Sequence, residues 1–285
     1  MSVIRIATRA SALALAQARW VAERLRSVDR GVDIDLVEVT TAGDADRVSP
    51  VTTLSEVGAF VRAVQAALLD GRADVAVHSC KDLPVSGPDG LATVFPARES
   101  PWDVLCGGTL ESLPPGAKVG TGSPRRAAQL ALLRPDLTVE DIRGNIDTRL
   151  GKVDSGELDA IVLAEAGLNR TGRQGQITQR LEVDQMVPAP AQGALAVEYV
   201  ASGAVGELLR PIDDSSTRAA VQAERALLAR TGAGCRAALG ALAIVESGSV
   251  IMHGFVEDDR GRRRASVPHV DADQASLLLQ RELAL

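Results

Sequence analysis

The stretch from Asp74 to Pro84 reads Asp-Val-Ala-Val-His-Ser-Cys-Lys-Asp-Leu-Pro, and it decides the fold assignment. Its first half, Val75 to Val77, is a short β-branched run of the kind that forms a buried parallel strand. Its second half brings five reactive or charged side-chain types together before Pro84. In open α/β sheets, ligands bind outside the carboxyl ends of the strands. His78 to Asp82 is therefore the predicted place of the chemistry, although a polar turn at a strand end also explains these residues taken alone.

Alternating strand and helix patterns surround this stretch. Val3 to Ala7 reads as a strand, and a helix is expected over about Ser11 to Leu25. A half-buried strand over Val32 to Thr40 and a helix over about Ala59 to Leu69 then lead into the central strand. The polar, turn-rich residues 41–50 favour a mobile loop. This order of elements predicts a parallel sheet with helices on its faces.

Composition limits the classes of protein that fit. The 285 residues suffice for two or three domains, and 46% hydrophobic with 24% charged residues is typical of a globular protein. Aromatic residues make up 2% and the net charge is −6, which disfavours a nucleic-acid binder. The sequence shows neither a secretory signal nor an apolar stretch long enough to span a bilayer. We therefore expect a cytoplasmic protein with no nucleic-acid and no membrane partner.

The three cysteines, Cys80, Cys106 and Cys235, lie far apart and have no metal-ligand spacing. An odd count without a secretory signal argues against disulfides and for a reducing compartment, and we expect no bound metal. Cys235 follows Gly232 and Gly234, and these glycines predict an exposed loop in which a large adduct fits. A buried, inert cysteine is the alternative, and the glycine-rich setting favours an accessible thiol over it.

Arginines gather in the middle of the chain where strands are followed by helices. A strand over 118–121 precedes Ser123, an expected N-cap, and Pro124, an expected first helical residue. The helix amino terminus with Arg125 and Arg126 in its first turn predicts an anion site. Adjacent residues diverge by about 100° around a helix. We therefore expect one of these arginines to face a partner carboxylate and the other to face the ligand.

Other arginines have a similar placement. Arg9 is expected at the carboxyl end of the first strand, and Arg143 follows a strand near 137–142. A solvated, arginine-rich helix face is the alternative explanation. The planar guanidinium group suits bidentate binding of carboxylates and phosphates, so we interpret these residues as an anion-binding set.

The remaining elements complete the predicted architecture. Strands are expected over 159–163 and 195–200, and the second of these returns to the first sheet. Residues 188–193, Pro-Ala-Pro-Ala-Gln-Gly, predict a rigid crossing between them. A long helix over about 216–229 precedes strands and a terminal helix from 239 onward, which predicts a small α+β domain.

Six motifs, taken together and in order, resemble the hydroxymethylbilane synthase family, also called porphobilinogen deaminases. The match runs from Arg5 to roughly Gly240. One departure is that Gly58-Ala59-Phe60 directly follows Val57, where the family usually has a longer glycine-rich segment. The motifs are Arg5-Ile-Ala-Thr-Arg9, Val77-His-Ser-Cys-Lys-Asp-Leu-Pro84, Gly120-Thr-Gly-Ser-Pro-Arg-Arg126, Arg143-Gly-Asn-Ile-Asp-Thr-Arg149, Pro190-Ala-Gln-Gly193 and Gly234-Cys235.

The resemblance implies an α/β fold with three domains. Two of them resemble the lobes of type II periplasmic binding proteins, with the active-site cleft between, and the third is a small C-terminal α+β domain. We assign residues 1–96 and 195–213 to domain 1, 97–194 to domain 2, and 214–285 to domain 3.

The resemblance also implies a transferase of tetrapyrrole, porphyrin and heme biosynthesis. Such an enzyme condenses four molecules of its small-molecule substrate, porphobilinogen, head to tail onto a covalent dipyrromethane cofactor. It releases ammonia at each addition and then hydrolyses the product. The family pattern assigns the catalytic aspartate to Asp82 and the thioether-bound dipyrromethane to Cys235, and we expect a monomer. Its cofactor- and substrate-binding positions fall on Arg9, Ser11, Lys81, Ser123, Arg125, Arg126, Arg143, Arg149, Arg170 and Gln192.

Two other classes of protein remain open at this stage. A non-enzymatic anion-binding protein of the periplasmic type shares two lobes and arginines, but it predicts a signal peptide and has no use for Asp82 or Cys235. A degenerate paralogue keeps the fold without turnover. Cys80 is the rival attachment point, although a tethered polymer has poor room beside Asp82. The intact mass of the purified protein distinguishes these readings.

Overall fold

The computed structural model describes residues 3–39, 55–231, 238–246, 249–269 and 271–285. Residue contacts divide the chain into two compact units. Unit 1 comprises Met1–Arg98 and Ala194–Arg218, and unit 2 comprises Glu99–Gly193 and Ala219–Leu285. The loop expected at 41–50 and the glycine-rich segment around Cys235 lie outside the described residues.

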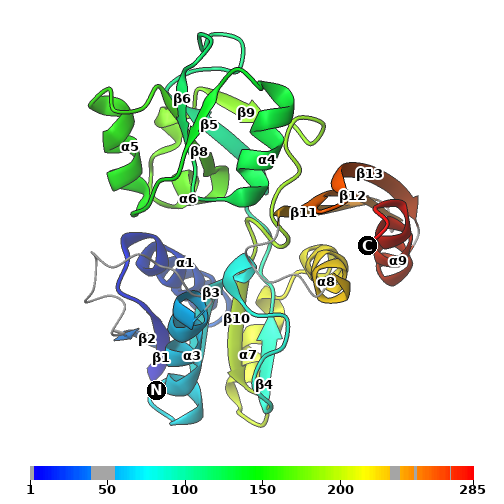
Figure 1. Cartoon of the computed structure of the whole chain (residues 1–285). Helices are drawn as coiled ribbons and strands as arrows, with labels where there is room; N and C mark the ends of the chain where they lie inside the picture. Colours follow the sequence, from blue (N-terminus) through cyan, green and yellow to red (C-terminus); the bar gives the residue numbers. More distant parts are fainter. Residues whose placement is uncertain (1–2, 40–54, 232–237, 247–248, 270) are drawn as a thin grey trace. The chain divides into compact units, whose positions relative to one another are not determined.

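Unit 1 is built on a five-stranded sheet with the order β2-β1-β3-β10-β4 (Figure 1). Strand β1 runs parallel to β2 and β3, as predicted, whereas β10 is antiparallel to both β3 and β4. The expected return of residues 195–200 to this sheet is confirmed. The antiparallel direction follows because β10 enters directly from Gly193, without the crossover helix that a parallel strand requires. The strands are β1 (Val3–Arg9), β2 (Asp33–Val39), β3 (Val75–Ser79), β4 (Leu91–Val94) and β10 (Leu195–Val200).

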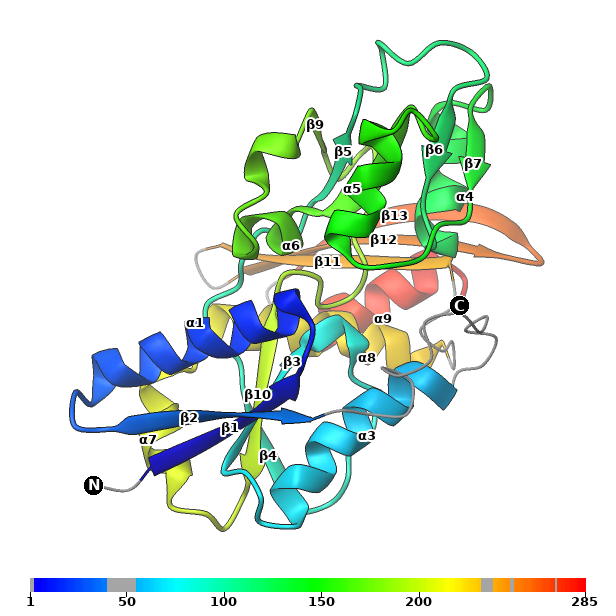
Figure 2. The same ribbon diagram turned by 90° about the vertical axis from the view of Figure 1, so that its left-hand side faces the viewer.

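Two long helices cover the opposite faces of this sheet (Figure 2). Helix α1 (Ala12–Val28) begins at Ser11, whose hydroxyl oxygen accepts the Ala14 N–H at 3.3 Å. Helix α3 (Ser55–Leu69) lies on the other face. In β1, Ile6 packs in the cluster of α1 and Ala7 packs in the cluster of α3. This alternation follows from the two-residue period of a strand, so both faces of β1 are buried.

Unit 2 contains a second five-stranded sheet, with the order β7-β6-β8-β5-β9. Again three strands are parallel, and the fourth, β5, is antiparallel to both of its neighbours. Leu130 of α4 packs on one face, and Leu150 of α5 and Leu168 of α6 pack on the other. The elements are β5 (Asp103–Cys106), β6 (Lys118–Gly120), α4 (Pro124–Leu133), β7 (Thr138–Glu140), α5 (Ile146–Asp154), β8 (Ala160–Ala164), α6 (Glu165–Arg170) and β9 (Gln179–Leu181).

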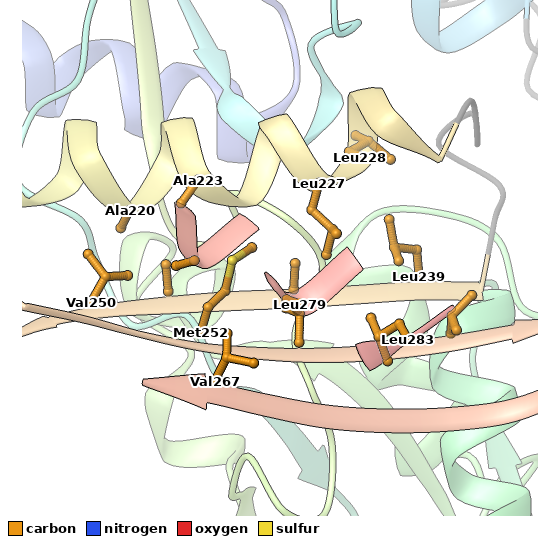
Figure 3. Close-up of a cluster of buried hydrophobic side chains, with 14 residues drawn as sticks. Ala220, Ala223, Leu227, Leu228, Leu239, Val250, Met252, Val267, Leu279 and Leu283 are labelled. Carbon is orange, nitrogen blue, oxygen red and sulfur yellow. The ribbon is translucent and has the colours of Figure 1, made fainter. Parts of the chain in front are cut away.

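The C-terminal part is a three-stranded antiparallel sheet with two helices, which confirms the predicted small α+β domain. Its core joins Leu227 of α8, Leu279 of α9 and Met252 of the central strand (Figure 3). None of the described helices combines the length and the apolar character needed to cross a membrane. The elements are α8 (Ser215–Arg230), β11 (Ala238–Glu246), β12 (Ser249–Asp258), β13 (Gly261–His269) and α9 (Ala272–Glu282).

The segment before β10 has an unusual backbone. Ala191 has a φ of 61° and Gly193 has a φ of 85°, both in the left-handed region. A Cβ atom on Gly193 would lie 2.3 Å from the Glu99 carbonyl oxygen and 2.6 Å from that of Ser100. The Ala191 N–H donates to the carboxylate of Glu224, a fully buried residue of α8. Close backbone contact and a buried hydrogen bond therefore fix this crossing.

The two left-handed positions predict unequal effects of substitution on stability. We expect Gly193→Ala to lower the free energy of unfolding by about 2 kcal/mol or more, because the added methyl overlaps two carbonyl oxygens at a positive φ. Ala191→Gly is the matched control, and it should change stability by less than about 1 kcal/mol because glycine relieves the strain. Urea unfolding followed by circular dichroism measures both, and equal losses in the two variants would contradict this account.

Candidate active site

The predicted chemical stretch lies at the carboxyl end of β3. The strand ends at Ser79, and a 3-10 turn, η1 (Cys80–Asp82), follows it directly. Cys80 is buried, and its N–H donates to the Ala194 carbonyl oxygen at 3.0 Å, which ties the turn to the start of β10. Lys81 is partly exposed and Asp82 is exposed. The turn thus presents the Asp82 carboxylate to solvent from a fixed backbone.

Arg9 and Ser11 come from the neighbouring parallel strand. Arg9 is the last residue of β1, as predicted, and its Cζ atom lies 3.8 Å from the centre of the Phe60 ring. The Ser11 hydroxyl caps α1, a structural role that differs from the ligand-binding role expected for this residue. Because β1 and β3 run parallel and adjacent, Arg9, Ser11 and Asp82 follow the same edge of the sheet.

In unit 2, Arg125 and Arg126 bind one buried carboxylate, that of Asp103 at the start of β5. Arg125 Nη1 lies 2.7 Å from Asp103 Oδ2, and Arg126 Nη2 lies 2.7 Å from Oδ1. Each guanidinium also donates to a carbonyl oxygen, Arg125 to Val187 at 2.7 Å and Arg126 to Val162 at 2.9 Å. All three charged side chains are buried.

The expected division of labour between these two arginines is wrong, because both face the partner carboxylate. Their Cβ atoms diverge around the helix, but two long side chains reach the two separate oxygens of Asp103. Ser123 is the N-cap and Pro124 the first helical residue, as predicted. Within the described chain, the Ser123 side chain makes no capping hydrogen bond.

Asp103 is not among the site residues predicted from the sequence. Burial alone would raise the pKa of this carboxyl, but the two guanidiniums and the hydrogen bonds from Arg125 and Gln192 hold the pKa well below its usual range. Gln192 Nε2 lies 3.0 Å from Asp103 Oδ1 and 2.8 Å from the Pro101 carbonyl oxygen. The sequence does contain a signal for this residue, because Asp103 directly precedes the apolar run Val104-Leu105-Cys106. A charged side chain at the start of a buried strand requires a partner of opposite charge.

Two further arginines lie near this buried group. Arg149 on α5 is half-buried, and its Nε donates to the Gly144 carbonyl oxygen at 2.8 Å. Burial lowers the pKa of Arg149, and the positive charges of Arg126 and Arg143 lower it further, while Asp141 opposes them. Arg143 is exposed, and its Nη2 atom lies 3.2 Å from Asp141 Oδ2. Positive charge is therefore in excess around Arg149, which is the condition for an anion site.

Arg170 ends α6 and contacts the crossing segment. Its Nη2 donates to the Gly193 carbonyl oxygen at 2.6 Å. Burial lowers the pKa of Arg170 to about 10, and the charge of Glu99 partly opposes this change. The guanidinium therefore stays charged at neutral pH while it holds the backbone at Gly193.

The predicted site residues thus form two groups. Unit 1 contains one group at the ends of β1 and β3, and unit 2 contains the other around α4, α5 and the crossing segment. Cys235 lies outside the described residues. The first group is Arg9, Ser11, Lys81 and Asp82, and the second is Ser123, Arg125, Arg126, Arg143, Arg149, Arg170 and Gln192.

Comparison with known proteins gives the following matches. Among solved structures, the BenM effector binding domain with its effector benzoate matches with a TM-score of 0.40 and 17% identity, over 74% of this chain and 91% of that chain. The family model described as "Porphobilinogen deaminase, dipyromethane cofactor binding domain" matches residues 4–205. The porphobilinogen deaminase of Thermobifida fusca is 50% identical over 277 residues, covering 95% of this chain and 83% of the relative. That of Cutibacterium acnes is 50% identical over 261 residues, covering 85% and 77%. The chain belongs to the porphobilinogen deaminase family.

Proposed function

We propose that this chain is a hydroxymethylbilane synthase in which Asp82 is the catalytic carboxylate and Cys235 carries the dipyrromethane. The enzyme joins four porphobilinogen molecules head to tail, releases ammonia with each, and hydrolyses the product to hydroxymethylbilane. Membership of the family supports the activity. The observation that carries the assignment of residues is the excess of guanidinium groups around Arg149 in unit 2.

The chemistry of the substrate explains this excess. Each pyrrole carries an acetate and a propionate, so a chain of pyrroles accumulates carboxylates. In unit 2, the guanidiniums of Arg125, Arg126, Arg143 and Arg149 are balanced by fewer carboxylates, those of Asp103 and Asp141. Arginine suits this task better than lysine because its planar fork binds a carboxylate through two hydrogen bonds.

The residues of unit 2 fit a dipyrromethane on two observations. Arg125 Nε is buried and has no hydrogen-bond partner among the described residues, and the positive charges of Arg126 and Arg143 lower the pKa of Arg149. Both conditions favour a bound group with several carboxylates. When bound, the dipyrromethane supplies the primer on which the pyrroles are joined. We assign the binding of its carboxylates to Arg143 and Arg149, and we assign a contribution of positive charge to Arg125 and Arg126 from their places around Asp103.

We assign proton transfer and charge stabilisation to Asp82. During each addition the C–N bond of porphobilinogen breaks and the amine leaves as ammonia, which leaves positive charge on the methylene-pyrrole. A C–C bond then forms and the attacked carbon loses a proton. A carboxylate beside these atoms accepts and returns the proton and stabilises the cation. Asp82 is exposed at the carboxyl end of β3, which is where such a group is needed.

Three further assignments belong to this proposal. We retain the division into domains 1–96 with 195–213, 97–194, and 214–285, which the three separate sheets support. We also retain the expectations of a monomeric state and a cytoplasmic location, which rest on the sequence.

Replacement of Asp82 tests the catalytic assignment. Asp82→Asn keeps the size of the side chain but removes the charge and the proton acceptor. We expect kcat to fall by about 10²-fold or more. The free energy of unfolding should change by less than about 0.5 kcal/mol, because the residue is exposed. The matched control is Asp89→Asn, an exposed aspartate of the same connection, which should keep wild-type turnover. A folded Asp82→Asn protein with near wild-type consumption of porphobilinogen would exclude Asp82 from this role.

Replacement of the cysteines tests the attachment point. The native protein should carry a covalent adduct of two linked pyrroles on the Cys235 peptide, measured by intact mass and after digestion. Cys235→Ser should lack the adduct and be inactive. Cys80→Ser and Cys106→Ser should keep it, because both thiols are buried and burial raises the pKa of Cys106 to about 11, which keeps it protonated. An adduct on either buried cysteine, or an unmodified mass after exposure to porphobilinogen, would refute the assignment.

A further inference from the structure

Asp103 lies outside all six sequence motifs, yet its carboxylate forms ion pairs with both Arg125 and Arg126 and accepts a hydrogen bond from Gln192. We propose that Asp103 is a positioning residue for the reaction, which holds Arg125 and Arg126 in one fixed arrangement whose surplus positive charge acts on the carboxylates of the bound pyrroles. This inference rests on the proposed function.

The contacts of the two guanidiniums support a fixed arrangement. Arg125 is held at Nη1 by Asp103 Oδ2 and by the Val187 carbonyl oxygen, both at 2.7 Å. Arg126 is held at Nε by Asp103 Oδ1 and at Nη1 by the Val162 carbonyl oxygen, both at 2.9 Å. A planar group that is held at two points can rotate little. The conformational entropy of both arginine side chains is therefore lost when the protein folds, and binding of a ligand does not have to reduce it further.

The carboxylate is itself held in place. Asp103 is the first residue of β5, and Gln192 Nε2 donates to its Oδ1 at 3.0 Å. The same Nε2 donates to the Pro101 carbonyl oxygen at 2.8 Å, two residues before Asp103. The carboxylate is therefore fixed by the sheet through its backbone and by the crossing segment through Gln192. Charged groups that act on a ligand keep a fixed geometry only when neighbouring residues, which do not touch the ligand, hold them in place.

The count of charges explains why one carboxylate serves two arginines. A second acidic group would make the cluster neutral and remove its attraction for an anion. With no acidic group, two buried cations would lie together without compensation, which is strongly unfavourable. One carboxylate permits burial of both arginines and leaves a surplus positive charge. That surplus extends to Arg149, because Arg126 contributes to the lowered pKa of Arg149.

Formation of the covalent adduct provides the test. Asp103→Asn keeps the shape of the side chain but replaces one carboxylate oxygen with an NH₂ group. Because this NH₂ group and the guanidinium that it faces are both hydrogen-bond donors, they can no longer bind each other. Protein prepared without porphobilinogen is mixed with porphobilinogen, and the adduct on the folded fraction is followed by intact mass against time. We expect the adduct to form about tenfold more slowly, or not at all, in Asp103→Asn. The same chain with Asp136→Asn, which breaks the exposed pair with Arg134, should form it at the wild-type rate.

A second control separates positioning from stability. Leu181 is fully buried in unit 2 and belongs to the cluster around Leu105 and Val119. Leu181→Ala should lower the midpoint of urea unfolding, as Asp103→Asn does, yet its folded fraction should form the adduct at the wild-type rate. If Leu181→Ala and Asp103→Asn slow the adduct equally, loss of stability explains the result and the proposal is wrong.

Acid unfolding gives an independent readout of the carboxylate. Because the pKa of Asp103 is lowered in the folded protein, its contribution to stability is present above the ordinary carboxyl pKa of about 3.9 and is lost as the pH falls below it. Asp103→Asn should lack this part of the acid dependence. If Asp103→Asn does not fold, Asp103→Glu replaces it, because the charge is kept and the guanidiniums are displaced. Wild-type adduct formation in Asp103→Glu then overturns the proposal.

The outcomes distinguish this inference from the proposed function. A wild-type protein that forms no adduct overturns both, whatever the variants do. A wild-type protein that forms the adduct, together with an Asp103→Asn protein that forms it equally fast, overturns the role of Asp103 alone. Adduct formation in wild type, Asp136→Asn and Leu181→Ala, with slow or absent formation in the Asp103 variants, is the result that the proposal requires.

Discussion

The organisation of unit 2 depends on one buried carboxylate that two guanidiniums share. Asp103 starts β5, Arg125 and Arg126 lie in the first turn of α4, and the carbonyl oxygens of Val187 and Val162 each accept one hydrogen bond from these guanidiniums. Burial of three charges is costly unless each is paired and hydrogen-bonded. These contacts therefore specify how a strand, a helix and a loop far apart in the sequence meet. The cost of burial is offset only when all of them are in place.

The five-stranded sheets of unit 1 and unit 2 have the same pattern of strand directions. In each sheet, three adjacent parallel strands lie beside a strand that is antiparallel to both of its neighbours, β10 in unit 1 and β5 in unit 2. The crossing backbone contributes to both sites, since Ala194 accepts the Cys80 N–H just before Asp82 and Gln192 donates to Asp103. Gly193 is required there because no side chain fits beside the carbonyl oxygens of Glu99 and Ser100.

Features with a local cause could be predicted from the sequence, and features with a distant partner could not. The strand before His78, the N-cap at Ser123 and the position of Arg9 each follow from neighbouring residues, and the structure confirms them. The antiparallel direction of β10 and the shared contact of both arginines with Asp103 depend on residues that meet only in the fold. The roles assigned to Asp82 and Cys235 came from family motifs and remain predictions.

The arginines of unit 2 divide into buried residues that surround Asp103 and more exposed residues, to which we assign contact with a ligand. Arg125 and Arg126 are buried around Asp103, whereas Arg149 is half-buried and Arg143 is exposed. Lysine is less suited than arginine to the buried positions, because burial lowers the pKa of a cation and a lysine starts from a lower value. Arg170 shows the size of this effect, with a pKa of about 10 that still leaves it charged at neutral pH. A lysine starts from about 10.4, so the same lowering would bring its pKa much closer to neutral pH than that of an arginine. Guanidinium groups therefore keep their charge by a wider margin than ammonium groups when they are buried.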